Sequence, residues 1–168
     1  MPEQSTLIHQ RDGTKTVYAP GSTSVLRSIK THSTYGPYAL AIDGSGNLYV
    51  GQYKSVTVYA SGSTSVLRTI KNGITSLSKI ALDASNNLYV VNFLENSVTV
   101  YAQGSTSVLR TITSGINGAQ AIEFDPSGNL YVANLTGNNV TVYGPGSTSV
   151  LRTITRAISG PVSLAFGP

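Results

Sequence analysis

The chain has 168 residues, a mass of 17.6 kDa and a net charge of +4, which fits one compact domain or an array of small units. Charged residues make up 11% and hydrophobic residues 40%, which excludes a disordered chain, since such chains are charge-rich and poor in apolar side chains. The absence of cysteine excludes disulfides, thiolate nucleophiles and cysteine zinc sites. No apolar run is long enough for a transmembrane helix, and the charge is too small and too scattered to indicate nucleic-acid binding.

An internal repeat is the main signal. The tripeptide Thr-Val-Tyr recurs at spacings of 41, 42 and 42 residues, and each copy is followed by Gly-Ser-Thr-Ser-Val-Leu-Arg. Repeats of this length that contain short strands are typical of propeller blades, whereas helical repeats would show apolar residues three and four apart. The four copies begin at Thr16, Thr57, Thr99 and Thr141.

Each repeat contains four predicted strands, numbered here from the centre of the ring outward. The second strand is the Leu-Tyr-Val run, the third is Val-Thr-Val-Tyr, and the fourth is the Val-Leu-Arg segment. All are rich in the β-branched and aromatic residues that favour strands, and Gly, Asn and Ser supply the turns. The first strands, with large apolar residues at alternate positions, are residues 38–43, 79–83, 120–125 and 162–166.

The two ends of the chain each supply part of one blade. The sequence opens at a second strand, residues 7–10, and ends just after a first strand, residues 162–166. We therefore expect an all-β propeller of four blades with about 42 residues and four strands each, closed by pairing between these terminal strands. The expected blades are residues 7–30 together with 162–168, then 38–70, 79–112 and 121–154.

The segments at residues 88–92 (LYVVN) and 130–134 (LYVAN), each followed by an Asn-containing loop and Val-Thr-Val-Tyr, resemble NHL and YVTN β-propeller repeats. The resemblance covers nearly the whole chain and implies the fold. It implies function only broadly, because these families include scaffolds, surface-layer proteins and a few lactonases and lyases. Such propellers usually have six or seven blades, so the chain could also form half of an eight-bladed dimeric ring. Monomer and homodimer both remain open.

The two faces of the expected ring differ. The turns between third and fourth strands and between first and second strands are almost constant among the repeats, whereas the loops on the opposite face vary. Variable loops on a rigid scaffold indicate a ligand-binding face, although loops also vary because they carry few packing constraints. Side chains on this face that suit a protein, peptide or carbohydrate ligand are His32, Tyr35, Tyr53, Lys54, Phe93, Glu95 and Arg156.

Few groups are left for catalysis. The aspartates Asp43, Asp83 and Asp125 recur at one turn position, Asp-x-Ser-x-Asn, and are interpreted as turn-stabilising. No catalytic residue, metal site or cofactor is predicted, because the remaining carboxylates and histidines do not match the ligand set of a propeller lactonase. A small hydrolase or lyase with a site in the central pit remains the alternative function.

Two inner-strand positions carry opposite charges. Lys79 and Glu123 lie in neighbouring blades at places that are mostly alanine in the other repeats. Because a charge in a narrow ring is costly unless it is paired, we expect them to face one another or to reach channel water. The arginines that recur on each outermost strand, at 27, 68, 110 and 152, are interpreted as guards of exposed strand edges.

The sequence thus predicts a non-catalytic repeat scaffold that binds a partner through its variable loop face. A purely structural or self-assembling surface module is a further alternative. The charge-poor surface, rich in Ser, Thr, Asn and Gly, resembles extracellular or cell-surface propellers, although residues 1–13 lack the basic and apolar regions of a signal peptide.

Overall fold

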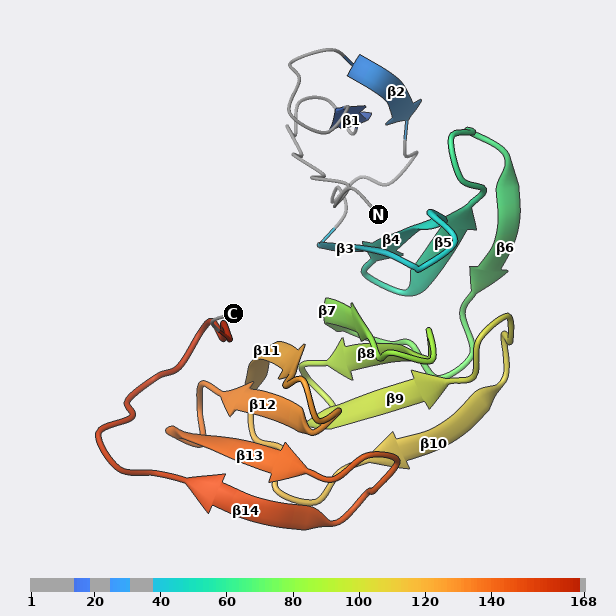
Figure 1. Cartoon of the computed structure of the whole chain (residues 1–168). Coiled ribbons are helices and arrows are strands. Elements are labelled where there is room, and N and C mark those ends of the chain that lie inside the picture. The colour runs from blue at the N-terminus through green and yellow to red at the C-terminus, as the bar shows by residue number, and fades with distance from the viewer. Residues whose placement is uncertain (1–13, 19–24, 31–37, 167–168) are drawn as a thin grey trace.

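The computed structural model describes residues 14–18, 25–30 and 38–166, and its regular structure is entirely β (Figure 1). A two-stranded sheet pairs β1 (Thr14–Tyr18) with β2 (Val25–Lys30). Three four-stranded antiparallel sheets follow it in chain order. Their strands are β3 (Ala39–Ile42), β4 (Leu48–Gln52), β5 (Ser55–Tyr59) and β6 (Val66–Ile70) in the first, β7 (Leu77–Leu82), β8 (Leu88–Asn92), β9 (Ser97–Tyr101) and β10 (Val108–Ile112) in the second, and β11 (Ala119–Phe124), β12 (Leu130–Asn134), β13 (Asn139–Tyr143) and β14 (Val150–Ile154) in the third.

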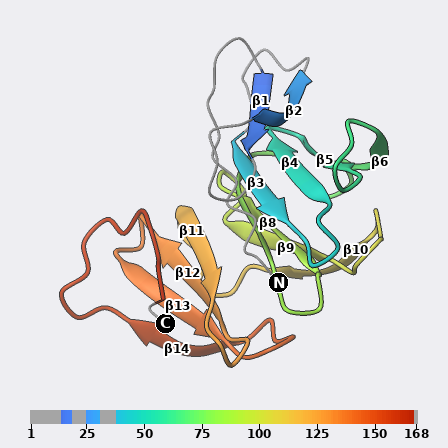
Figure 2. The ribbon, with the colours of Figure 1, turned by 45° about the horizontal axis from the view of Figure 1, so that its top comes forward.

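The sheets follow one another around an arc, with their first strands inside and their last strands outside (Figures 1 and 2). Strand β3 lies beside β7, and β7 lies beside β11, so the first strands of the three four-stranded sheets line the centre as the sequence predicts. Each four-stranded sheet is a simple up-and-down meander, in which every strand pairs with its neighbour in sequence.

The core lies between successive sheets. Tyr49 and Val58 of one sheet pack in a single cluster with Ile80 and Leu88 of the next, and all four are at most 8% exposed. Because each sheet is covered on both faces, the Leu-Tyr-Val runs are apolar throughout and do not alternate between apolar and polar residues. The valines that end these runs, Val50, Val90 and Val132, are fully buried.

The expected closed ring of four four-stranded blades is wrong. The structure has three four-stranded sheets and, in the described part of the N-terminal repeat, two strands only. Residues 162–166, expected to be a first strand, are in no strand. A strand forms only where a neighbour supplies a hydrogen-bonded ladder, and no described strand pairs with this segment. The expected partner, residues 7–10, lies outside the described residues.

Candidate functional site

The hairpin turns between first and second strands are held by the repeated aspartates, as the sequence predicts. The Asp83 carboxylate accepts hydrogen bonds from the backbone N–H of Ser85 and of Asn87, each at 2.9 Å, and from the Asn87 side-chain amide at 2.8 Å. The same three bonds recur in the turns that begin at Asp43 and Asp125. The amide of Asn129 is the main cause that holds the pKa of the Asp125 carboxyl below its usual value.

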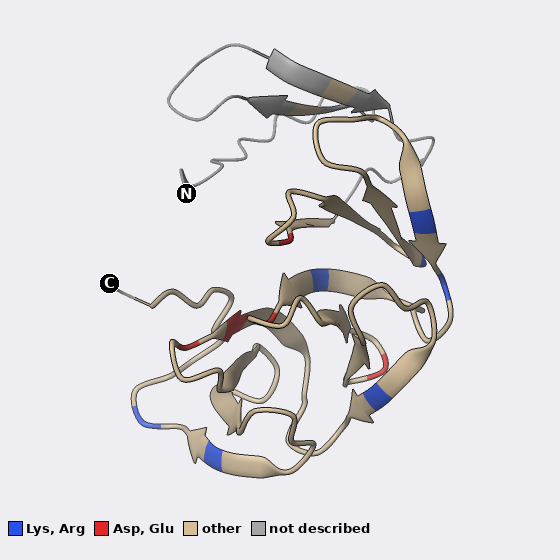
Figure 3. Ribbon diagram, turned by 45° about the vertical axis from the view of Figure 1, so that its right-hand side comes forward, with Lys and Arg blue, Asp and Glu red and all other residues tan. Residues whose placement is uncertain are grey.

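The arginines of the outermost strands have a role beyond guarding strand edges. Figure 3 shows a basic residue on each of β6, β10 and β14 in an otherwise charge-poor ribbon. Arg110 reaches across the sheet and donates from Nη2 to the Tyr89 hydroxyl at 2.7 Å, with its guanidinium 5.7 Å from the ring centroid. Arg68 and Arg152 bind Tyr49 and Tyr131 in the same way. Each of these arginines therefore binds a tyrosine of its own sheet.

On the opposite face, each of the last two sheets fastens the loop that leads into it. The buried Asn134 accepts a hydrogen bond from the backbone N–H of Asn117 at 2.9 Å and donates to the carbonyl of Gly115 at 3.1 Å. Tyr143 donates to the carbonyl of Ser114 at 2.6 Å. Asn92 and Tyr101 make the equivalent bonds to the preceding loop. We call each Asn–Tyr pair a loop latch, a role that the sequence analysis does not predict for these residues.

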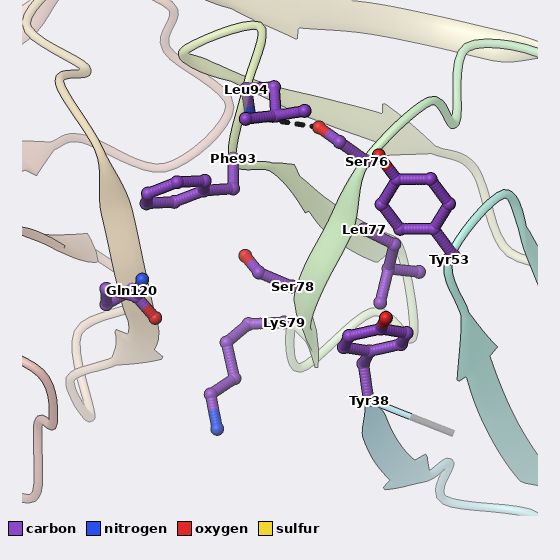
Figure 4. A pocket seen from close by; sticks show the side chains of 9 residues that line it. All are labelled: Tyr38, Tyr53, Ser76, Leu77, Ser78, Lys79, Phe93, Leu94 and Gln120. Carbon is purple, nitrogen blue, oxygen red and sulfur yellow. Dashed lines mark hydrogen bonds between the residues drawn. The ribbon is translucent and has the colours of Figure 1, made fainter. Parts of the chain in front are cut away.

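A cavity of about 450 Å³ opens on this loop face between the sheets β3–β6 and β7–β10 (Figure 4). Tyr53 and Phe93 come from loops between second and third strands, and Leu94 beside them is 66% exposed. Figure 4 shows the Ser78 hydroxyl pointing toward the side of the cavity on which Phe93 and Gln120 lie, and this buried oxygen has no hydrogen-bond partner. The remaining lining residues are Tyr38, Ser76, Leu77 and Lys79.

A charged pair lies at the rim of this cavity. The Ser76 hydroxyl donates to the Glu95 carboxylate, and this bond is the main cause that holds the pKa of Glu95 below its usual range. Lys54 lowers the pKa of Glu95 further, and its Nζ lies 5.9 Å from the centre of the Tyr53 ring. Ser76 in turn accepts a hydrogen bond from the backbone N–H of Leu94, at 2.9 Å, so the loop that carries Glu95 is fixed to the cavity wall.

The structure brings together four of the seven side chains predicted for the binding face. Tyr53 and Phe93 line the cavity, and Lys54 and Glu95 lie at its rim. Arg156 is exposed in the loop after β14 and does not line the cavity. The predicted residues His32 and Tyr35 lie outside the described residues.

Sequence reasoning missed most of the other lining residues, among them Tyr38, Leu94 and Gln120. The sequence pattern places Tyr38 and Gln120 only in inner strands, and it does not distinguish Leu94 from the rest of its loop. A signal for Leu94 did exist: the corresponding position of the next repeat is Thr136, so an apolar residue on an exposed loop was unusual there.

Lys79 and Glu123 both line a second cavity of about 240 Å³, where the inner strands gather around the centre. Both side chains are exposed, and no ion pair joins them in the structure. The backbone N–H of Phe124 donates to Glu123 at 3.3 Å. The energetic coupling of Lys79 with Glu123 therefore stays a prediction. Lys79 also lines the larger cavity, so it lies where the two cavities meet.

Within residues 14–18, 25–30 and 38–166, no three His, Cys, Asp or Glu side chains are grouped as they would be to hold a metal ion. In the same ranges, no helix is long and apolar enough to cross a membrane. The lactonase-like alternative stays an untested prediction.

Comparison with known proteins identifies the fold. The chain superposes on the WD40 β-propeller domain of Doa1 with a TM-score of 0.72 at 13% identity, over 86% of this chain and 48% of that one. The chain has a β-propeller fold. The computationally designed protein Ika8 matches with a TM-score of 0.74 at 17% identity, over 94% of this chain and 48% of that one. Hydrazine synthase of Kuenenia stuttgartiensis matches with a TM-score of 0.68 at 22% identity, over 86% and 41%.

The propeller therefore spans about half the length of these solved structures. Its sequence matches no protein-family model and no curated protein. The fold expected from the NHL and YVTN resemblance is confirmed in its class, a propeller of antiparallel β-sheets, and membership of either family stays a prediction.

Proposed function

We propose that this propeller is a non-catalytic interaction module that binds a peptide segment of a partner protein in the cavity on its loop face. The observation that carries the proposal is the cavity of about 450 Å³, which is lined by aromatic and aliphatic side chains on the face where the repeats differ. Concave apolar sites with a few placed polar groups are typical of ligand binding.

The polar groups at this cavity suit a peptide backbone. The buried Ser78 hydroxyl has no partner and is free to bond to an N–H or carbonyl of the ligand. Lys79 and the rim residues Lys54 and Glu95 add charges of both signs next to the apolar wall. A short peptide with one apolar anchor residue would cover Leu94 and Phe93 and satisfy Ser78.

Selection from a displayed random-peptide library on the wild-type protein, followed by titration of a selected peptide, tests the proposal. The key variant is Leu94→Thr, which introduces the residue of the next repeat at a site that is 66% exposed. Its matched control is Leu151→Thr, on the outermost strand β14, where the leucine is 64% exposed. We expect Leu94→Thr to weaken binding by about tenfold, and Leu151→Thr by less than about twofold.

Two results would contradict the proposal. Selected peptides could bind Leu94→Thr and Phe93→Leu as tightly as they bind the wild type, which would place the binding surface elsewhere. Alternatively, the library could yield no binder while a glycan array yields one that depends on Tyr38 and Tyr53, which would assign the cavity to carbohydrate.

A further inference from the structure

The wall of the loop-face cavity carries a positive charge that no carboxylate of this wall balances. Lys79, on β7, is the one charged residue among the described residues that line the cavity. Within the described ranges no ion pair joins it to a carboxylate. Glu123, which lines the second cavity together with Lys79, accepts a hydrogen bond from the backbone N–H of Phe124. The charge of Lys79 is therefore available to a ligand.

Folding does not require this charge. Lys79 stands four residues before the turn aspartate Asp83, and the corresponding positions of the neighbouring sheets are Ala39 and Ala121. The two other inner strands thus form with a small neutral side chain at this place. The Lys79 side chain is exposed, so its charge is not held in the interior of a sheet.

Two neutral polar groups line the cavity together with Lys79. Ser78 precedes it on β7, and Gln120 lies on β11, the strand beside β7 (Figure 4). The Ser78 hydroxyl oxygen is buried without a partner, and the half-buried Gln120 side chain has no hydrogen bond to a described residue. Ammonium, hydroxyl and amide groups all donate hydrogen bonds, so the three together suit a negatively charged acceptor.

The neighbouring groups determine what accompanies this acceptor. Phe93 and Leu94 belong to the apolar part of the cavity wall. At the rim, the Glu95 carboxylate accepts a hydrogen bond from Ser76, and Lys54 lowers its pKa further. The negative charge of Glu95 is therefore stabilised by groups other than Lys79, and an apolar wall lies next to a positive charge without a partner in the described chain.

We propose that the cavity recognises a ligand carboxylate next to an apolar side chain, with Lys79 as the charge partner of that carboxylate. This preference rests on the proposed function, because the ligand is a peptide. The C-terminus of a peptide and the side chain of an aspartate or glutamate supply the same chemistry. One ammonium group balances the single charge of a carboxylate, whereas a phosphate monoester carries close to two charges at neutral pH.

Affinity measurements with matched synthetic peptides test this preference on the full chain. The probe is a peptide selected from the displayed library, prepared in three forms: with a free C-terminus, with a C-terminal amide, and with each aspartate and glutamate replaced by its amide. We expect one of the two neutralised forms to bind the wild type about fivefold more weakly, as for a partly exposed ion pair. The form that loses affinity shows which carboxylate is bound.

The variant Lys79→Met keeps a long side chain without its charge. It should bind the carboxylate form and the neutralised form within about twofold of each other, because the interaction that distinguishes them is gone. Lys71→Met is the matched control, since it removes one exposed positive charge from the loop after β6, at a residue that does not line the cavity. Lys71→Met and the charge-conserving Lys79→Arg should both retain the fivefold preference.

The possible results separate this preference from the proposed function. Peptides that bind, lose affinity in Leu94→Thr and do not prefer a carboxylate would overturn the preference and leave peptide binding at the cavity intact. A carboxylate preference that Lys79→Met leaves unchanged would do the same. If no library peptide bound at the cavity, both proposals would be overturned.

Discussion

One face of this propeller carries the hairpin turns between first and second strands (the turn face), and the other carries the variable loops (the loop face). The two faces differ in which side chains recur from blade to blade. On the turn face, the three hairpins that begin at Asp43, Asp83 and Asp125 have the same side-chain bonds to within about 0.1 Å. On the loop face, the residues that recur from blade to blade are those that bind backbone groups, such as Asn92 and Asn134. The side chains around the cavity differ between blades. Side chains that bind the chain to itself are thus repeated, and side chains that face the cavity are free to differ.

The sheet β3–β6 differs from the other two at the end of its second strand. Where the other two sheets have Asn92 and Asn134 at the end of the second strand, this sheet has Gln52. The side-chain amide oxygen of Gln52, Oε1, accepts a hydrogen bond from the Ser55 hydroxyl at 3.1 Å, within its own hairpin. The longer side chain therefore serves the hairpin.

The largest effect is expected from Asn134→Ala. The substitution leaves the Asn117 N–H without an acceptor and removes the amide donors to Gly115 and Thr141, at a site with no exposed surface. Unsatisfied buried groups cost about 1–3 kcal/mol each, so we expect the free energy of unfolding to fall by about 3 kcal/mol. Urea denaturation measures this change, with Gln52→Ala as the control at the matching position. Equal losses in the two variants would show that the latch has no special role.

A smaller loss is expected from Tyr143→Phe, which removes only the hydroxyl of the same latch. The Ser114 carbonyl loses a donor at 2.6 Å, which predicts a loss of about 1–2 kcal/mol in the free energy of unfolding. Tyr131→Phe is the comparison, because the bond that it removes, from Arg152, is exposed. If Tyr131→Phe were the more destabilising of the two, the outer arginine–tyrosine pair and not the latch would dominate.

The smallest predicted effect is on the stability of the Asp125 turn at acidic pH. The pKa of Asp125 is lowered in the folded state, so its carboxylate contributes stability that is present above the usual aspartate value near 4 and is lost as the pH falls through the folded pKa. Asp125→Asn removes this titration. We therefore expect a plot of melting temperature against pH to fall less steeply below about pH 4 in the variant than in the wild type. Parallel curves would mean that the turn carboxylate does not couple to folding.

Most of the fold could be predicted from the sequence, because each repeat carries its own strand and turn signals. The strands at Leu48, Leu88 and Leu130 begin where the Leu-Tyr-Val runs begin, and the aspartate turns have the predicted role. Ring closure was predicted wrongly, because pairing between distant segments such as residues 162–166 depends on the curvature of the whole arc. Local patterns do not encode this curvature.

The candidate site was only half predictable. Loop variation identified Tyr53 and Phe93, which do line the cavity. It did not identify Gln120, because that residue belongs to an inner strand and reaches the cavity only through the packing of one blade against the next. Arg156 lies on a loop of the same variable face, and the sequence alone does not show that it lies away from the cavity.

Urea denaturation of the double variant Phe93→Leu/Leu94→Thr tests most directly whether the cavity side chains are kept for binding and not for folding. The two substitutions introduce the residue types that the next repeat has at the corresponding positions, Leu135 and Thr136. We predict a free energy of unfolding within about 1 kcal/mol of the wild-type value, since Leu94 is exposed and leucine keeps an apolar side chain at the half-buried Phe93. A loss comparable to that of Asn134→Ala would show that Phe93 and Leu94 stabilise the blade, and would contradict the assignment of this face to a ligand.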